Sequence, residues 1–215
     1  AFNSRVVFEN VYTEGIARIT ARDILYAKEM GCEIKLLGVA RLTPEGIEAR
    51  VHPMLIDSDH PLASVQDSYN AVFVRGDAVQ DTMFYGRGAG EMPTASAVVG
   101  DVFDCVRNIL ADCCGRIGCT CYKDLPVRKI SDIRSKYFVR MEVEDRSGVL
   151  ASVAAVFGNN DVSIAQGMQK RKRSELAEIV VITETVQERH FMDAIRILEG
   201  MSLIRNISSL IRVYD

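Results

Sequence analysis

Three glycines at alternate positions, Gly86, Gly88 and Gly90, are the strongest candidates in this sequence for contact with a ligand or cofactor. They follow an apolar run, 83–85, that predicts a strand, and they precede Pro93, which is typical of the first turn of a helix. Such a turn brings backbone N–H groups together with no Cβ atoms in the way. It could admit a phosphate, a carboxylate or a flat cofactor ring, or it could be a tight turn that binds nothing.

The spacing alone leaves that choice open. The glycines follow the pattern GxGxG, whereas the dinucleotide-binding fingerprint is GxGxxG inside a βαβ unit. Glu91, directly after the turn, could approach a substrate ammonium group. It could equally be a first-turn acid that the helix dipole favours.

Two other groups of residues could bind a metal ion. His52 and His60 lie near two aspartates in a predicted loop, but their spacing matches no common metal site, so local hydrogen bonding is the simpler interpretation. Four cysteines fall within residues 113–121: Cys113, Cys114, Cys119 and Cys121. Their spacing differs from that of zinc modules, which favours free thiols over a metal or redox site. We therefore predict no metal site.

The composition fits a globular protein without a nucleic-acid or membrane partner. The chain has 215 residues, 48% of them hydrophobic and 26% charged, with a net charge of −3. No apolar run is long enough to span a bilayer and no signal-peptide pattern is present, so we expect a cytoplasmic protein. The basic run 170–173 has no interleaved aromatic residues, which indicates a solvated hairpin turn.

The elements around the glycine turn predict an α+β fold. Residues 20–23 have the form of a capping box at the start of a helix that Gly31 ends. Strands are predicted at 33–42, 47–51, 69–74 and 79–85. We expect a mostly antiparallel sheet with helices on one face.

A second pattern begins at residue 136. The segment 137–145 alternates as a half-buried strand, and a helix is predicted at 149–158. Strands at 162–169 and 176–183, helical spacing at 191–198 and a last strand at 202–214 complete the order βαββαβ. This order predicts a ferredoxin-like sandwich.

Residues 85–101 resemble the GxGAGxxPTASAVVxD segment of bacterial homoserine dehydrogenases. Further stretches resemble the same family in the same order: 14–16, 23–24, 34–38, 51–56 and 60–62. The resemblance covers residues 1–110, which we expect to be the C-terminal part of a catalytic and dimerisation domain.

This resemblance implies NAD(P)-dependent interconversion of L-homoserine and L-aspartate 4-semialdehyde, in threonine and methionine biosynthesis. It also implies that the backbone at Gly88, Ala89 and Gly90 contacts the cofactor near the nicotinamide or the substrate pocket. In the family, a Rossmann domain and a catalytic lysine precede this part. We therefore expect a fragment that is inactive alone, contains no catalytic residue and binds no cofactor tightly.

Residues 136–215 resemble the ACT family of amino-acid-sensing domains. Residues 143–151 are similar to its DxPGVLA turn, with Ser147 where proline is usual, and 159–164 are similar to its N-x-SI opening of the second strand. The resemblance implies an effector site where the first strand meets the first helix, often between two domains. The expected effector contacts are Asp145, Gly148, Val149, Leu150 and Asn160.

The implied pathway makes L-threonine the expected effector, although nothing in 136–215 distinguishes it from another small amino acid. We expect the chain to pair with itself, as a homodimer or as a tetramer through ACT domains. Residues 111–135 are predicted to be a cysteine-rich linker between the two domains. Two other functions stay open: a non-catalytic amino-acid-sensing and dimerisation module, and a metal-binding regulatory protein.

Overall fold

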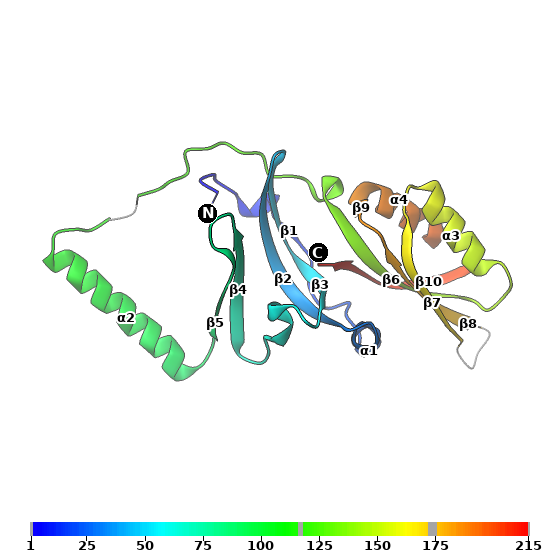
Figure 1. Ribbon diagram of the computed structural model, residues 1–215, viewed down its shortest axis with the longest axis horizontal. Coiled ribbons are helices and arrows are strands. Elements are labelled where there is room, and N and C mark those ends of the chain that lie inside the picture. The colour runs from blue at the N-terminus through cyan, green and yellow to red at the C-terminus, as the bar shows by residue number, and fades with distance from the viewer. Residues whose placement is uncertain (1, 116–117, 172–175, 215) are drawn as a thin grey trace.

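The computed structural model describes residues 2–115, 118–171 and 176–214, which form two sheets and four α-helices (Figure 1). The larger sheet has the order β1-β3-β10-β6-β8-β7, with β2 paired to β3 and β9 paired to β6. Its strands are β1 (Tyr12–Thr13), β2 (Cys32–Thr43), β3 (Gly46–Asp57), β6 (Arg134–Glu144), β7 (Ile164–Arg171), β8 (Leu176–Thr183), β9 (Val186–Gln187) and β10 (Ile204–Val213). The smaller sheet is the hairpin of β4 (Tyr69–Gly76) and β5 (Gln80–Arg87).

The helices begin and end where local chemistry favours it. They are α1 (Ala21–Glu29), α2 (Glu91–Leu110), α3 (Val149–Asn159) and α4 (Glu188–Glu199), with three short 3₁₀ helices at Phe8–Asn10, Pro61–Ser64 and Ile130–Asp132. The predicted capping box is confirmed: the Thr20 hydroxyl accepts from the Asp23 N–H, and the Asp23 carboxylate accepts from the Thr20 N–H. Gly31, at φ +69°, follows the last turn of α1, as predicted for a helix end.

The long hairpin of β2 and β3 forms the first half of the large sheet. Its register runs without a break from Cys32 opposite Asp57 to Thr43 opposite Gly46. Gly46 has φ +136°, and a Cβ on it would lie 2.3 Å from the carbonyl oxygen of Pro126. That carbonyl accepts a 2.8 Å hydrogen bond from the Ile47 N–H, so the turn fixes the segment around Pro126 against the hairpin.

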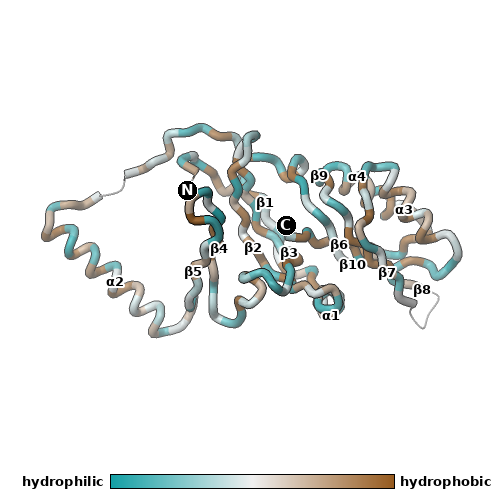
Figure 2. Tube along the Cα trace, viewed as in Figure 1, coloured by the Kyte–Doolittle hydropathy of each residue, from teal (hydrophilic) through white to brown (hydrophobic). Residues whose placement is uncertain are grey.

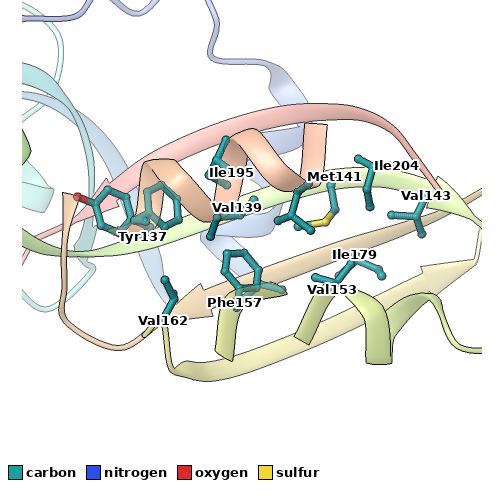
Figure 3. Packing of buried hydrophobic residues seen from close by; sticks show 14 of the residues in the cluster. Tyr137, Val139, Met141, Val143, Val153, Phe157, Val162, Ile179, Ile195 and Ile204 are labelled. Atoms are coloured by element: carbon teal, nitrogen blue, oxygen red, sulfur yellow. The ribbon is translucent and has the colours of Figure 1, made fainter. Parts of the chain in front are cut away.

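The second half is the predicted ferredoxin-like sandwich. Its main strands occur in the order β10-β6-β8-β7, all antiparallel, and α3 and α4 cover one face. Figure 3 shows the core between them, in which alternate residues of β6 point toward α3 and α4: Tyr137, Val139, Met141 and Val143. Residues 172–175, on which part of the predicted basic turn falls, lie outside the described residues.

The prediction that 137–145 is half-buried is wrong, because β6 is buried on both faces. The face opposite α3 and α4 packs on the first half of the chain, where Phe138 forms a second core with Tyr26 and Ala27 of α1 and Leu55 of β3. The two halves also share backbone pairing, since β10 runs parallel to β3 with Arg212 opposite Met54. The eight strands therefore form one continuous sheet across both halves (Figure 1).

The β4–β5 hairpin is not part of that sheet, although we expected its strands there. It leads into α2, which extends away from the large sheet (Figure 1). Apolar residues recur along α2 in Figure 2, yet none of its side chains is buried. Among the described helices, none combines the length and apolar character needed to cross a bilayer.

Candidate functional sites

The glycine turn connects β5 to α2 and holds a distinctive backbone geometry. Gly90 is the N-cap of α2 with φ +130° and ψ +150°, a region that other residues rarely adopt. A Cβ on Gly88 would lie 1.5 Å from the side-chain nitrogen of Asn70 on the neighbouring strand. Gly86 is different, because a Cβ there would meet no atom within 4 Å. The structure thus requires glycine at position 90, favours it at 88 and does not require it at 86.

Aromatic and cationic groups hold the start of this turn. The rings of Tyr69 and Tyr85 stack across the hairpin with their centroids 4.8 Å apart, and the Arg87 guanidinium lies over Tyr69. The Gly88 N–H donates to the carbonyl of Ser68, the residue before β4, at 2.9 Å. The hairpin therefore fixes the position at which α2 begins.

The turn fits a polar or anionic part of a cofactor. Gly90 provides no side-chain cap, and the first intrahelical bond of α2 runs from the Thr94 N–H to the Gly90 carbonyl. The N–H groups of Glu91 and Met92 precede that bond, so they are available to a ligand, and Pro93 has no N–H to offer. These groups, next to the exposed residue Ala89, form a small N–H cradle at a helix N-terminus.

The N-terminus of α3 is the second candidate site. Gly148 is its N-cap with φ +88°, and its carbonyl accepts from both the N–H and the hydroxyl of Ser152. Val149 is buried in the core, whereas Leu150 is 47% exposed. Asp145 lies in the exposed bend before the helix. This end of α3 has the N–H geometry that a carboxylate requires.

Asn160 does not join those residues. It is the C-cap of α3, and its side-chain amide donates to the Val156 carbonyl at 2.8 Å. Asn160 lies twelve residues after Gly148, at the other end of α3, which corresponds to roughly 18 Å at 1.5 Å per residue. Within one copy of the chain, the five predicted effector contacts therefore do not form one site.

Both histidines make local hydrogen bonds, as the simpler interpretation predicted. The Nδ1 atom of His60 accepts from the Leu62 N–H at 3.1 Å and caps the 3₁₀ helix Pro61–Ser64. His52 is fully buried, and its Nδ1 lies 3.1 Å from the Pro53 carbonyl. Burial, with Arg212 nearby, lowers the pKa of His52 to about 4, so this ring is neutral at pH 7.

The six cysteines are free thiols. The Cys113 thiol donates to the Asn108 side chain at 3.6 Å. Cys119 and Cys121 are exposed, and their thiols are hydrogen-bonded to each other. Throughout residues 2–115, 118–171 and 176–214, no three metal-ligating side chains come together as a site.

A network of buried charged side chains lies between α1 and the second half of the sheet. The Arg140 guanidinium, on β6, donates to Asp23 at 2.8 Å and to Glu178 of β8 at 3.0 Å. Glu178 also accepts from the Tyr26 hydroxyl at 2.6 Å and pairs with Arg22 at 3.0 Å. Both carboxylates are fully buried. We call Asp23, Arg140 and Glu178 the junction triad.

Hydrogen bonds decide the charge state of the triad. Burial alone would raise the pKa of the Asp23 carboxyl, but hydrogen bonds from Arg140 and Thr20 outweigh it and lower that pKa. Burial is likewise outweighed at Glu178, whose pKa is lowered by hydrogen bonds from Tyr26 and Arg140. The triad is therefore ionised at neutral pH and connects the two halves through charge-assisted bonds.

Both parts of the chain are similar to known proteins. The sequence model of the family described as homoserine dehydrogenase matches residues 1–103, and that of the ACT domain matches 137–200. The homoserine dehydrogenase of Neisseria gonorrhoeae is 39% identical over 219 residues, covering 99% of this chain and 50% of that protein. The one of Pseudomonas aeruginosa is 40% identical over 220 residues, covering 99% and 51%. This chain belongs to the homoserine dehydrogenase family and corresponds to a C-terminal region of such an enzyme.

Solved structures of homoserine dehydrogenases share its fold. The crystal structure from Thiobacillus denitrificans has a TM-score of 0.90 at 38% identity, over 100% of this chain and 50% of that one. The enzyme from Staphylococcus aureus at pH 7.0 has a TM-score of 0.65 at 27% identity with the same coverage. The chain spans about half the length of the curated relatives it matches.

The junction triad is the feature of this homoserine dehydrogenase region that the sequence analysis missed. Arg140 stands in the apolar run of β6 on the same face as Phe138, and Glu178 interrupts the apolar run of β8 in the same way. Charges at those positions suggest an exposed face. A buried arginine needs a carboxylate partner, so an ion pair at Arg140 could be predicted. The sequence does not identify Asp23 as that partner, because the two residues are 117 positions apart in the chain and adjacent only in the folded structure.

Proposed function

We propose that the polypeptide containing this chain catalyses the NAD(P)-dependent interconversion of L-homoserine and L-aspartate 4-semialdehyde. The observation that carries the proposal is the glycine turn, with its N–H cradle, in a chain about 40% identical to homoserine dehydrogenases along 99% of its length. The activity would serve threonine and methionine biosynthesis in the cytoplasm. When bound, the nicotinamide would accept or deliver the hydride at C4 of the substrate.

This chain's own role would be to position rather than to transfer protons. The backbone of Gly88, Ala89 and Gly90 would contact the cofactor, and the Glu91 and Met92 N–H groups would complete the cradle. The catalytic lysine that the family implies would come from the rest of the polypeptide. We propose residues 1–110 as the catalytic and dimerisation part, 111–135 as a linker and 136–215 as the ACT domain.

We propose that the ACT domain provides feedback control by a small amino acid, with L-threonine as the first ligand to test. The N-terminus of α3, at Gly148 and Val149, would hold its carboxylate. Asn160 could take part only from a second copy of the domain, which agrees with self-association as a dimer or tetramer. Asp145 and Leu150, exposed at the same end of α3, would contact the remainder of the ligand.

The test is homoserine-dependent reduction of NAD⁺ or NADP⁺, followed at 340 nm, in the full polypeptide. Gly90→Val imposes a side chain on a φ of +130°, so we expect a loss of at least tenfold in kcat/KM. Gly86→Ala is the matched control in the same turn, because its Cβ meets no atom within 4 Å. Full activity of the folded Gly90→Val protein would contradict the proposed role of the turn.

A non-catalytic sensing and assembly module is the second candidate. The apolar surface of α2 and the β4–β5 hairpin favours it, since Phe84 is 66%, Val102 56% and Ile109 67% exposed. A homodimer by mass measurement, together with no turnover of homoserine by the full polypeptide, would support this candidate over the dehydrogenase.

A further inference from the structure

A cavity of about 510 Å³ lies between the two halves of the chain, away from both sites described above. One wall is the segment 12–19 that leads from β1 to α1, and the other is formed by α4 and β10. Its volume falls in the range of pockets that bind small molecules, about 300–1,000 Å³. Neither the glycine turn nor the N-terminus of α3 contributes a lining residue.

The floor of the cavity is polar and internally satisfied. The Arg212 guanidinium donates to Glu188 at 3.0 Å and to Glu14 at 3.1 Å, and Glu188 also accepts from the Tyr137 hydroxyl at 2.6 Å. Arg212 and Glu188 are both buried. Because these groups already pair with one another, the floor offers a fixed surface rather than a free charge.

The rim carries two charges of opposite sign that are not used elsewhere. Arg18 stands on the segment before α1, and Glu199 stands at the end of α4. Both are exposed, and neither forms a hydrogen bond or ion pair with another residue of the described chain. They are not within ion-pair distance of each other, although they line the same cavity. A ligand with one positive and one negative group could pair with both.

Between floor and rim, the wall is apolar. Phe191 and Met192 of α4 face the cavity together with Ile207 and Leu210 of β10. The lining carboxylates are Glu14, Glu188 and Glu199 and the lining cations are Arg18 and Arg212, so the formal charge is 2 − 3 = −1. A ligand that is only an anion is therefore disfavoured, whereas one with an ammonium group is favoured.

We propose that this cavity binds an α-amino acid as its zwitterion, with the carboxylate at Arg18, the ammonium group at Glu199 and an aliphatic side chain against Phe191 and Leu210. Because the walls come from both halves, the bound amino acid stabilises their contact. Binding at this cavity would therefore affect the first half of the chain directly, independently of the site at the N-terminus of α3. The inference goes beyond the proposed function, and its test does not depend on dehydrogenase activity.

The experiment is calorimetric titration of the 215-residue chain with each of the twenty L-amino acids. For the tightest of them, we expect at least tenfold weaker binding in Arg18→Gln and in Glu199→Gln. Arg196→Gln is the control on the same helix, because Arg196 pairs with Asp193 and does not line the cavity. Gly148→Trp at the N-terminus of α3 should leave this affinity unchanged.

Analogues of the tightest amino acid test the zwitterion directly. The amine without the carboxylate and the hydroxy acid without the ammonium group should each bind at least tenfold more weakly. The proposal is overturned if no amino acid binds, if either analogue binds as tightly as the amino acid, or if Gly148→Trp abolishes binding while Arg18→Gln and Glu199→Gln do not.

Discussion

Replacing Arg140 by methionine should weaken the contact between the two halves of the chain. Methionine preserves much of the apolar stem but leaves the fully buried Asp23 without the guanidinium that lies 2.8 Å from its carboxylate. Removing one partner of a buried ion pair costs about 3–5 kcal/mol, because the remaining charge is left uncompensated. Glu178 keeps Arg22 and Tyr26, and Asp23 keeps Thr20, so we expect the lower end, about 3 kcal/mol.

The assay is urea unfolding at pH 7 for the wild type and Arg140→Met, with circular dichroism as the probe. Arg196→Met is the matched control, because its pair with Asp193 is exposed and such pairs contribute roughly 0–1 kcal/mol. A loss of under 1 kcal/mol in the free energy of unfolding of Arg140→Met, with an unchanged m-value, would refute the argument that the junction triad holds the halves together.

The pH dependence gives the same argument a second test. Because the pKa values of Asp23 and Glu178 are lowered in the folded state, their contribution is present above the unfolded pKa values and is lost as pH falls through the folded ones. The difference in stability between the wild type and Arg140→Met should therefore shrink as the solution becomes acidic. A difference that is constant from pH 7 to pH 3 would contradict the assigned charge states.

Three further predictions concern single positions. The pKa of His52 is about 4 in the folded state against an ordinary 6.5, so its ring stays neutral when folded but becomes protonated on unfolding below pH 6.5. Between pH 6.5 and 4, the free energy of unfolding of the wild type should therefore fall by about 3 kcal/mol relative to that of His52→Asn. Parallel profiles of urea stability against pH would contradict this. Gly46→Ala should lower the free energy of unfolding in urea by about 1–3 kcal/mol, because φ is +136° and the Pro126 carbonyl lies where the Cβ would be. Gly38→Ala in the same hairpin is the control, because its Cβ would make only an ordinary contact. Equal effects of the two substitutions would contradict the role of Gly46 in the turn. Gly148→Ala should lower stability by about 1 kcal/mol, because Gly148 has φ +88°. Gly158→Ala should raise stability by up to about 1 kcal/mol, because Gly158 lies inside α3 and its Cβ would meet open space. Melting temperatures in the opposite order would contradict the assigned start of the helix.

Local signals in the sequence were sufficient for most elements. The capping box at Thr20, the glycine turn before α2 and the βαββαβ order all depend on neighbours within a few residues, and the structure contains each of them. The pairing of β10 with β3 could not be predicted, because it joins Arg212 to Met54 across most of the chain. The same holds for the β4–β5 hairpin, whose alternating pattern indicates strands but not which sheet they enter.

The candidate sites, too, could be predicted from the sequence only where they depend on local structure. Positive φ at Gly90 and Gly148 follows from the glycine patterns that predicted both turns. The distance of Asn160 from Gly148 follows from the length of α3, which the sequence pattern predicts. The expectation that both residues contact one ligand comes from the family resemblance. The junction triad and the cavity between the halves depend on tertiary packing of side chains that a single sequence presents as ordinary surface charges.

Turnover of L-homoserine by the full polypeptide, with NAD⁺ and NADP⁺ supplied separately, distinguishes the dehydrogenase from the sensing module. We expect a homoserine-dependent increase in absorbance at 340 nm with at least one cofactor, and loss of that activity in Gly90→Val but not in Gly86→Ala. Absence of turnover with either cofactor, in a folded polypeptide that binds amino acids and self-associates, would contradict the dehydrogenase and favour the sensing module.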